Sequence, residues 1–344
     1  MAEVDLSVVV PVYNAEKWLA ETMDALLCQT LSSIEIIAVD DGSTDGCPAA
    51  LDEYAQRDAR VRVIHRENAG VWRARETGVA QARGRYVGFC DRDDLPLPHM
   101  AERLVRAADE AQAEMAVCAF LREDMDSSRT LSSEMTAFGD RVYDLSWTPE
   151  ILPAVNTAMW NKIIRVDVFK RAVHFDEPPR TAEDMMCLCS LYPLMRRAAF
   201  VSEPLYRYRV HSDSAMSYLK PEEIAHMQSC MRRVRQDVVA KTADARMLMV
   251  CDEMAFIHFG VAVTLRRVQS GERASEEAGR QREFLKKDFP YYRKAGGSLL
   301  WNIRNGGLKI KIWLVRMAYV THLMGAFLSA YSWLTRVLGI DIKW

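Results

Sequence analysis

Short, almost continuous runs of hydrophobic residues alternate with segments of helical periodicity over the first third of the chain. The runs are typical of strands buried on both faces, and they cover residues 6–12, 34–39, 61–64, 86–90 and 115–120. The segments between them, such as 15–27 and 70–82, space their apolar residues at helical intervals. This alternation predicts an α/β fold in which helices flank a doubly wound, mostly parallel sheet.

The rest of the chain has fewer strand signals. Residues 121–150 are polar and lack a clear period, so we expect a variable insertion there. Apolar stripes at helical spacing predict two helices between residues 221 and 271, and a long apolar stretch predicts another helix over 308–338. We therefore expect three regions: an α/β domain over 1–215, an accessory helical region over 216–297, and a basic and apolar C-terminal helix within 298–344.

Polar residues follow the first, second and fourth predicted strands. Tyr13 and Asn14 come directly after the first strand, and Asn14 is expected to cap the helix that follows. Asp40-Asp41 and Asp91-Arg92-Asp93 follow the second and fourth strands. Because ligands of open α/β sheets bind at the carboxyl ends of strands, we expect these groups to converge on one crevice.

The acidic segment 91–94 places three carboxylates within four positions. Like charges this close repel, which favours a bound cation, and Mg²⁺ is typically held by one or two carboxylates plus substrate phosphates. The alternative is an acidic turn exposed to solvent. The sequence has neither G-x-G-x-x-G after its first strand nor G-x-x-x-x-G-K-[ST] anywhere, which argues against a dinucleotide dehydrogenase and a P-loop enzyme.

Composition adds three constraints. The 344 residues are 49% hydrophobic and 27% charged, as in ordinary globular proteins. Eight scattered cysteines without a C-x-x-C pair predict a reduced interior instead of a disulfide framework or zinc site. The acidic N-terminus runs straight into a strand and shows no secretory signal, so we expect a cytoplasmic protein.

Four motifs in this order and spacing resemble the signature of family 2 glycosyltransferases with the GT-A fold. They are V-P-V-Y-N at 10–14, V-D-D-G-S-T-D at 39–45, N-A-G-V-x-x-A-R at 68–75 and G-F-x-D-x-D-D at 88–94. The resemblance covers roughly residues 5–215. It implies that Pro11 and Tyr13 flank a uracil base and that Asp41 accepts its imide N–H. Arg75 would face the nucleotide or its diphosphate; a surface helix arginine is the alternative.

The same resemblance assigns the acidic segment. Asp91 would contact the ribose, and Asp93 would hold Mn²⁺ or Mg²⁺. The family usually has a small residue in the middle of this motif, where this sequence has Arg92, and its guanidinium could point to solvent or pair with the diphosphate. Asp94 is interpreted as a turn or cap residue.

An acidic pair, Glu183-Asp184, opens an apolar helix and matches the family's E-D position. The resemblance implies that Asp184 is the general base of an inverting transfer, while Glu183 orients the acceptor or Asp184. Helix capping is the alternative, since the dipole favours acidic residues there anyway. The run that begins at Tyr208 and contains Arg209 and His211 resembles a Y-R-x-H-x-x-S run of the same family. The resemblance makes Arg209 and His211 candidates for phosphate or metal contact, although a lone histidine is usually structural. Residues 159–164 resemble a segment near the donor sugar, or form a strand with a snorkelling lysine.

The C-terminal end is basic. From Lys286 onward the chain carries a net charge of +8, which leaves −10 for the rest of a protein whose total is −2. The apolar helix expected over 308–338 begins with basic residues and contains interspersed aromatic ones, a pattern typical of a helix lying in a membrane interface. Packing on the protein's own body and true spanning are the alternatives. An anionic membrane surface is therefore an expected partner.

Together these features predict an inverting glycosyltransferase of hexosyl or N-acetylhexosaminyl type. Its donor is expected to be a UDP-sugar, and its acceptor a glycan or lipid-linked glycan of surface polysaccharide synthesis. We expect no nucleic acid partner and a peripheral location on the inner face of the cell membrane. The alternatives are a membrane-associated scaffold without activity and a nucleotidyltransferase, although the latter normally has a glycine-rich basic loop that is absent here.

Overall fold

The computed structural model describes residues 3–210, 219–324 and 326–328. The chain forms two compact units, which we describe separately. The first comprises Met1–Thr148, Thr157–His174 and Leu194–Ala215; the second comprises Pro149–Asn156, Phe175–Pro193 and Met216–Trp344. Two segments of the domain expected over 1–215 therefore fold with the second unit.

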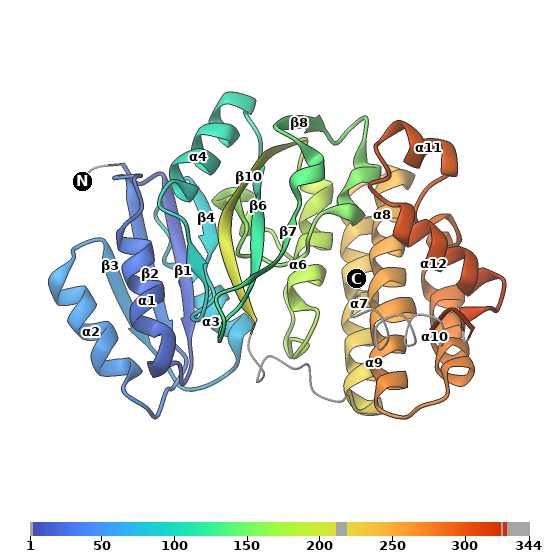
Figure 1. Ribbon diagram of the computed structural model, residues 1–344, viewed down its shortest axis with the longest axis horizontal. Coiled ribbons are helices and arrows are strands. Elements are labelled where there is room, and N and C mark those ends of the chain that lie inside the picture. Colours follow the sequence, from blue (N-terminus) through green and yellow to red (C-terminus); the bar gives the residue numbers. More distant parts are fainter. Residues whose placement is uncertain (1–2, 211–218, 325, 329–344) are drawn as a thin grey trace. The chain divides into compact units, whose positions relative to one another are not determined.

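The first unit contains one ten-stranded mixed sheet (Figure 1), with the order β3-β2-β1-β4-β9-β6-β10-β5 and with β7 and β8 paired to β6 and β10. Neighbours among β3, β2, β1 and β4 are parallel, as are β6 and β10, whereas β9 is antiparallel to β4 and β6. The predicted α/β fold with a sheet flanked by helices is thus confirmed, but the sheet is mixed: β5, β7 and β8 also pair antiparallel, so that five of the nine strand pairings are antiparallel. The strands are β1 (Leu6–Val12), β2 (Ile34–Asp40), β3 (Val61–His65), β4 (Tyr86–Phe89), β5 (Leu95–Pro96), β6 (Met115–Asp124), β7 (Thr130–Glu134), β8 (Arg141–Asp144), β9 (Lys162–Arg165) and β10 (Arg197–Val210).

Helices cover both faces of this sheet. Alternate β1 residues such as Leu6 and Val8 share a core cluster with Met23 of α1 and Leu104 of α4. On the opposite face α3 lies so close to β1 that a Cβ atom added at Gly78 would be 2.4 Å from Val9 Cγ1. The helices are α1 (Glu16–Leu27), α2 (Cys47–Arg57), α3 (Val71–Ala80), α4 (Met100–Ala111), α5 (Val166–Phe169) and the 3₁₀ helix η1 (Thr136–Phe138).

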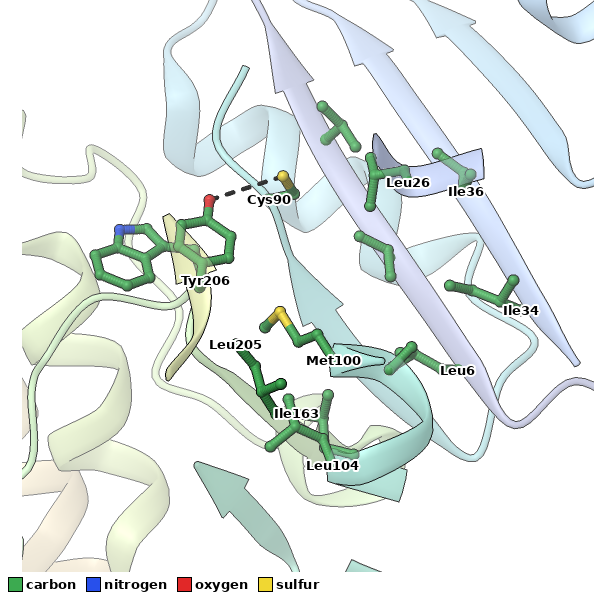
Figure 2. Packing of buried hydrophobic residues seen from close by; sticks show 14 of the residues in the cluster. Leu6, Leu26, Ile34, Ile36, Cys90, Met100, Leu104, Ile163, Leu205 and Tyr206 are labelled. Carbon is green, nitrogen blue, oxygen red and sulfur yellow. Dashed lines mark hydrogen bonds between the residues drawn. The ribbon is translucent and has the colours of Figure 1, made fainter. Parts of the chain in front are cut away.

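The core between α1, α4 and the sheet extends to the carboxyl end of β4. Figure 2 shows the side chains of Leu6, Met100 and Leu205 in this cluster, with Tyr206 of β10 turning its hydroxyl toward Cys90. The Tyr206 hydroxyl oxygen lies 3.7 Å from Cys90 Sγ. Residues directly after β4 are thereby attached to a rigid, apolar base.

The insertion expected over 121–150 is partly regular. β6 continues to Asp124, and β7 and β8 add to it and to β10 as antiparallel strands. The side chains of β7 are exposed or half-buried. Its residues therefore show no apolar alternation in the sequence, because neither face of the strand is covered.

The second unit is helical, and α7 and the stretch from α8 to α9 confirm the two helices expected between residues 221 and 271. All eight cysteines of the chain are free thiols. The helical elements are η2 (Pro149–Ala154), α6 (Glu183–Leu191), η3 (Tyr192–Leu194), α7 (Pro221–Lys241), α8 (Ala245–Ala255), the π-helix η5 (Phe256–Val263), α9 (Thr264–Gln269), α10 (Ala274–Asp288), η6 (Pro290–Lys294), α11 (Leu299–Arg304) and α12 (Ile310–Val320).

Among the described residues, one helical stretch, Ala245–Gln269, is long and apolar enough to cross a membrane, with a mean hydropathy of 1.6. However, 67% of its most apolar window is buried inside the protein, and core helices pass the same test of length and composition. Phe256 and Phe259 in its middle are fully buried. This stretch is the central helix of the second unit's core.

The prediction of one uninterrupted helix over 308–338 is wrong within the described residues. Helix α12 ends at Val320, and His322 has a left-handed backbone with φ 62°. Arg282 of α10 donates hydrogen bonds to the Tyr319 carbonyl oxygen at 2.9 Å and to His322 Nδ1 at 2.7 Å. These contacts take up acceptors at the helix end, which the apolar sequence pattern does not reveal. Residues 329–338 lie outside the described part.

Candidate functional site

The carboxyl ends of β2, β1 and β4 are neighbours in the sheet, as the sequence predicted. Pro11 is buried in β1, and as a proline it has no N–H to donate to a neighbouring strand. The pairing of β1 with β4 ends at Val9 and Phe89, before Pro11 is reached, so the missing N–H costs no hydrogen bond between these two strands. Tyr13, just beyond the strand, is 44% exposed. An exposed aromatic ring beside a strand end is available for stacking with a nucleotide base.

Asn14 does not cap α1, contrary to expectation. It has a left-handed backbone with φ 46°, and the helix begins after Ala15 without a side-chain cap. Its Oδ1 instead accepts a hydrogen bond from the Thr44 N–H at 2.8 Å, and its own N–H donates to Ser43 Oγ at 3.1 Å. Asn14 therefore ties the loop after β1 to the D-G-S-T-D turn after β2.

Asp41 is 3% exposed and organises the turn before α3. Its Oδ2 accepts hydrogen bonds from the N–H groups of Gly70 at 2.7 Å and Ala69 at 3.2 Å, and its Oδ1 lies 3.2 Å from Arg66 Nε. Gly70 has φ 90°, a conformation that favours glycine. Asp41 Oδ1 also accepts from the Ala69 N–H at 3.1 Å, so the carboxylate is already held by four contacts, and the expected imide hydrogen bond stays a prediction.

Arg75 is buried, so its interpretation as a surface helix arginine is wrong. It projects from α3, with its guanidinium carbon 5.8 Å from the centre of the Phe89 ring. Its Nη2 lies 3.1 Å from Oδ1 of Asp91, whose side chain is 31% exposed. The structure thus joins two residues that the sequence assigned separately to the nucleotide.

Asp94 has a larger role than the turn expected from the sequence. Its N–H does close a turn with the Asp91 carbonyl oxygen, but its carboxylate is buried and accepts hydrogen bonds from the Arg209 N–H at 2.8 Å and the Tyr206 hydroxyl at 2.9 Å. Burial raises the pKa of this carboxyl well above its usual range, and the charges of Asp91 and Asp93 raise it further. No local pattern could have identified this tether, because Arg209 lies 115 residues further along the chain.

Arg209 reinforces the same connection between β10 and the loop after β4. Its backbone binds Asp94, its Nε donates to the Asp93 carbonyl oxygen, and its Nη1 pairs with Glu21 of α1. Its Nη2 is shielded from solvent and forms no hydrogen bond with any residue that the structure describes. The structure therefore brings Arg209 to Asp93, whereas His211 lies outside the described residues.

We expect Tyr206→Phe to destabilise the protein by about 1–3 kcal/mol, since removing the hydroxyl leaves buried polar groups unpaired. The Tyr206 hydroxyl accepts a hydrogen bond from the Asp91 N–H at 3.2 Å in addition to donating to Asp94. The measurement is urea unfolding followed by circular dichroism. Tyr208→Phe is the control, because both tyrosines stack on Trp160, at 4.6 and 5.2 Å between ring centroids. Equal unfolding midpoints for the two variants would contradict the tether.

The carboxylates after β4 fit a hard divalent cation. Asp91 and Asp93 are partly exposed, and Arg75 pairs with Asp91. Carboxylate oxygens are the ligands that Mg²⁺ prefers, and phosphates of a bound substrate usually complete its shell. Among the described residues no group of three or more His, Cys, Asp or Glu side chains could hold a metal. A cation here would therefore depend on few protein ligands, with Asp93 foremost.

Glu183 and Asp184 form the first turn of α6 in the second unit, and both are half-buried. The residues from Met185 to Leu191 are all buried, so this helix is firmly anchored. Ala182, which precedes the pair, has a left-handed backbone with φ 65°. Such a conformation in a residue other than glycine costs about 1–2 kcal/mol, and five other non-glycine residues of the described chain share it. The roles of Glu183 and Asp184 stay predictions.

The segment 159–164 contains a strand, β9, but its lysine does not snorkel. Lys162 is 1% exposed, and its Nζ donates to Asn161 Oδ1 at 2.6 Å and to the Ala158 carbonyl oxygen. Trp160, two residues before β9, stacks on Tyr206 and Tyr208 of β10. The lysine is buried because these carbonyl groups replace the water that its charge would otherwise need.

Known proteins share both sequence and fold with this chain. The model of the family "Glycosyl transferase family 2" matches residues 7–173. EpsJ of Bacillus subtilis, described as an uncharacterized glycosyltransferase, is 37% identical over 230 residues, which are 65% of this chain and 66% of EpsJ. The glycosyltransferase GlyG of Streptococcus pneumoniae is 32% identical over 221 residues, 61% of this chain and 72% of GlyG.

Among solved structures, that of S. aureus TarS 1–349 in complex with UDP-GlcNAc matches with a TM-score of 0.71 at 18% identity, covering 99% of this chain and 93% of that one. The likeness shows a GT-A fold, with its sheet and its C-terminal helices. The chain belongs to glycosyltransferase family 2, as its motifs predicted. Its match spans about two thirds of EpsJ, and the family model ends before Glu183.

Proposed function

We propose that this protein is an inverting glycosyltransferase that transfers a hexosyl or N-acetylhexosaminyl group from a UDP-sugar to a glycan or lipid-linked glycan of a surface polysaccharide. The observation that carries the proposal is the group of Tyr13, Asp91 and Asp93 at adjacent strand ends, backed by buried Arg75. Two comparisons support the substrate classes. TarS was solved with UDP-GlcNAc, and the minor teichoic acid biosynthesis protein GgaB of Bacillus subtilis is 30% identical over 224 residues.

On the donor side, Tyr13 would stack against the base, and Asp91, held by Arg75, would accept hydrogen bonds from the ribose hydroxyls. Asp93 would hold Mn²⁺ or Mg²⁺, which when bound neutralises charge on the leaving diphosphate. The guanidinium of Arg209, fixed beside Asp93, would make a second contact with the diphosphate.

The chemical step is a single displacement. The acceptor hydroxyl oxygen forms a bond to the anomeric carbon while the bond from that carbon to the β-phosphate oxygen breaks, and UDP leaves. Asp184 takes the proton of the hydroxyl, as a carboxylate within hydrogen-bond reach can. The configuration at the anomeric carbon is inverted, because attack and departure occur on opposite faces.

The experiment is a calorimetric titration of the full chain with UDP, with GDP as the matched control, first with Mn²⁺ and then with a chelator. We expect the protein to bind UDP more tightly than GDP, and we expect its affinity for UDP to fall when the cation is removed. Binding of neither nucleotide would overturn the proposal in favour of a scaffold without activity. Release of pyrophosphate from a nucleoside triphosphate and a sugar phosphate would instead indicate a nucleotidyltransferase.

A further inference from the structure

Exposed apolar side chains are concentrated in one short stretch of the second unit. Of the thirteen large hydrophobic residues that are exposed in the described part of the chain, seven lie between residues 299 and 323, with exposed fractions of 41–68%. We call them the α11–α12 face: Leu299, Leu300 and Ile303 of α11, Leu314, Met317 and Val320 of α12, and Leu323 just after α12. Contiguous exposed apolar surface marks interaction sites more often than scattered residues do.

The orientation of helix α12 is fixed by its buried side, so the exposed apolar side chains cannot rotate into the protein. Leu314, Met317 and Val320 follow one another at intervals of three and are exposed, whereas Val315 and Tyr319 on the other side are buried. Tyr319 fixes that orientation, since its hydroxyl donates to the Ala278 carbonyl oxygen at 3.1 Å and its ring packs edge-on against Phe256. The helix therefore has one partner within the protein and a second apolar side without one among the described residues.

Helix α11 is the neighbour of α12 at this end of the second unit (Figure 1). It is held by Asn302, which is buried and whose Nδ2 donates to the Gly296 carbonyl oxygen at 2.7 Å while its Oδ1 accepts from the Lys309 N–H at 2.9 Å. The exposed Leu300 and Ile303 project from this anchored turn. Their exposure is thus built into the fold.

The chain segment that carries the α11–α12 face is basic. The sequence contains no acidic residue between Asp288 and Asp341. Exposed basic residues lie within and beside the two helices, namely Arg293, Lys294, Arg304 and Lys311. Apolar side chains bordered by cations complement a bilayer that carries anionic headgroups. A second copy of the chain would bring like charges together at the same place.

We propose that the α11–α12 face binds an anionic lipid bilayer, with both helices lying along its surface. The apolar side chains would enter the interfacial region, and the basic residues would pair with anionic headgroups. This deepens the proposed function, because a lipid-linked acceptor is embedded in such a surface, but it rests on observations of its own. The sequence led us to expect the membrane contact on one helix over 308–338, whereas the proposal places it on α11, which precedes that range, and on α12, which ends at Val320.

The test is co-sedimentation of the full chain with vesicles of phosphatidylcholine alone or mixed with phosphatidylglycerol. We expect binding to the mixed vesicles and much weaker binding to the neutral ones, with a further loss at high salt. The variants Leu300→Ser/Ile303→Ser and Leu314→Ser/Met317→Ser should each weaken binding about tenfold or more, since each removes two inserted side chains. Val239→Ser is the control, because Val239 is equally exposed on α7 of the same unit.

Each result decides the question. Vesicle binding that is unchanged in both double variants would overturn the proposal and assign the membrane contact to another part of the chain. Self-association that is lost in these variants, without any vesicle binding, would make the face a contact between copies. UDP binding should be the same in all variants, so failure of the membrane proposal is distinguishable from failure of the proposed function.

Discussion

Asp184→Asn is expected to lower the rate of sugar transfer by about 10²–10⁴-fold while leaving UDP affinity unchanged. The amide keeps the shape of the carboxylate but cannot accept the proton of the acceptor hydroxyl. The residue lies in the first turn of an anchored helix whose following residues are all buried, so the substitution should leave the fold intact. The measurement is UDP release from the donor in the presence of acceptor, combined with calorimetric titration of UDP.

The matched control is Glu183→Gln on the same helical turn. We expect it to reduce transfer less than Asp184→Asn, because Glu183 orients the acceptor or Asp184 and takes no proton. If Asp184→Asn retained full transfer activity, Asp184 would not be the base. If instead the two variants lost only folding stability, the acidic pair would serve the helix N-terminus alone.

Asp93→Asn is expected to weaken UDP binding in the presence of Mn²⁺ by about tenfold or more, and to have little effect once a chelator is present. The substitution removes the charged oxygen ligand but retains the backbone carbonyl that accepts the Arg209 hydrogen bond. The loss should therefore concern the cation and not the position of the loop. Calorimetric titration with and without Mn²⁺ measures it.

Arg92→Ala is the control for Asp93→Asn, since it changes the adjacent residue and leaves the carboxylates in place. It should retain the dependence of UDP binding on Mn²⁺. Equal UDP affinity of the protein and of Asp93→Asn in Mn²⁺ would argue against a cation at Asp93. Binding that survives the chelator in the unchanged protein but falls in Arg92→Ala would assign the diphosphate to the guanidinium.

The sequence predicted the sheet well because its central strands are covered on both faces. All seven residues of β1 and all seven of β2 are buried, so their hydrophobic runs are continuous and unmistakable. The motifs at the strand ends then located Tyr13, Asp41, Asp91 and Asp93, since strand order brings successive parallel strands to one edge. In this part of the chain the hydrophobic pattern of each strand agrees with the position of that strand in the sheet.

Elsewhere the decisive contacts are distant in sequence. Lys162 is buried by carbonyl groups that no periodicity reveals, and α12 ends where an arginine of α10 meets its last turn. The role of Asp94 depends on Tyr206 and Arg209, more than a hundred residues away. The pattern of apolar residues along the chain predicts which face of a helix or strand is buried. It does not predict which polar group of a neighbouring element will contact that face.

The tether from Asp94 to Tyr206 and Arg209 also constrains the order of folding. Contacts between residues so far apart form late, because the loss of chain entropy must be compensated before they contribute. During synthesis the loop after β4 emerges long before β10 does. We therefore expect the loop after β4 to take its final shape only when β10 joins the sheet, later than the turn that contains Asn14 and Asp41. The acidic loop is thus completed only by the last strand of the first unit.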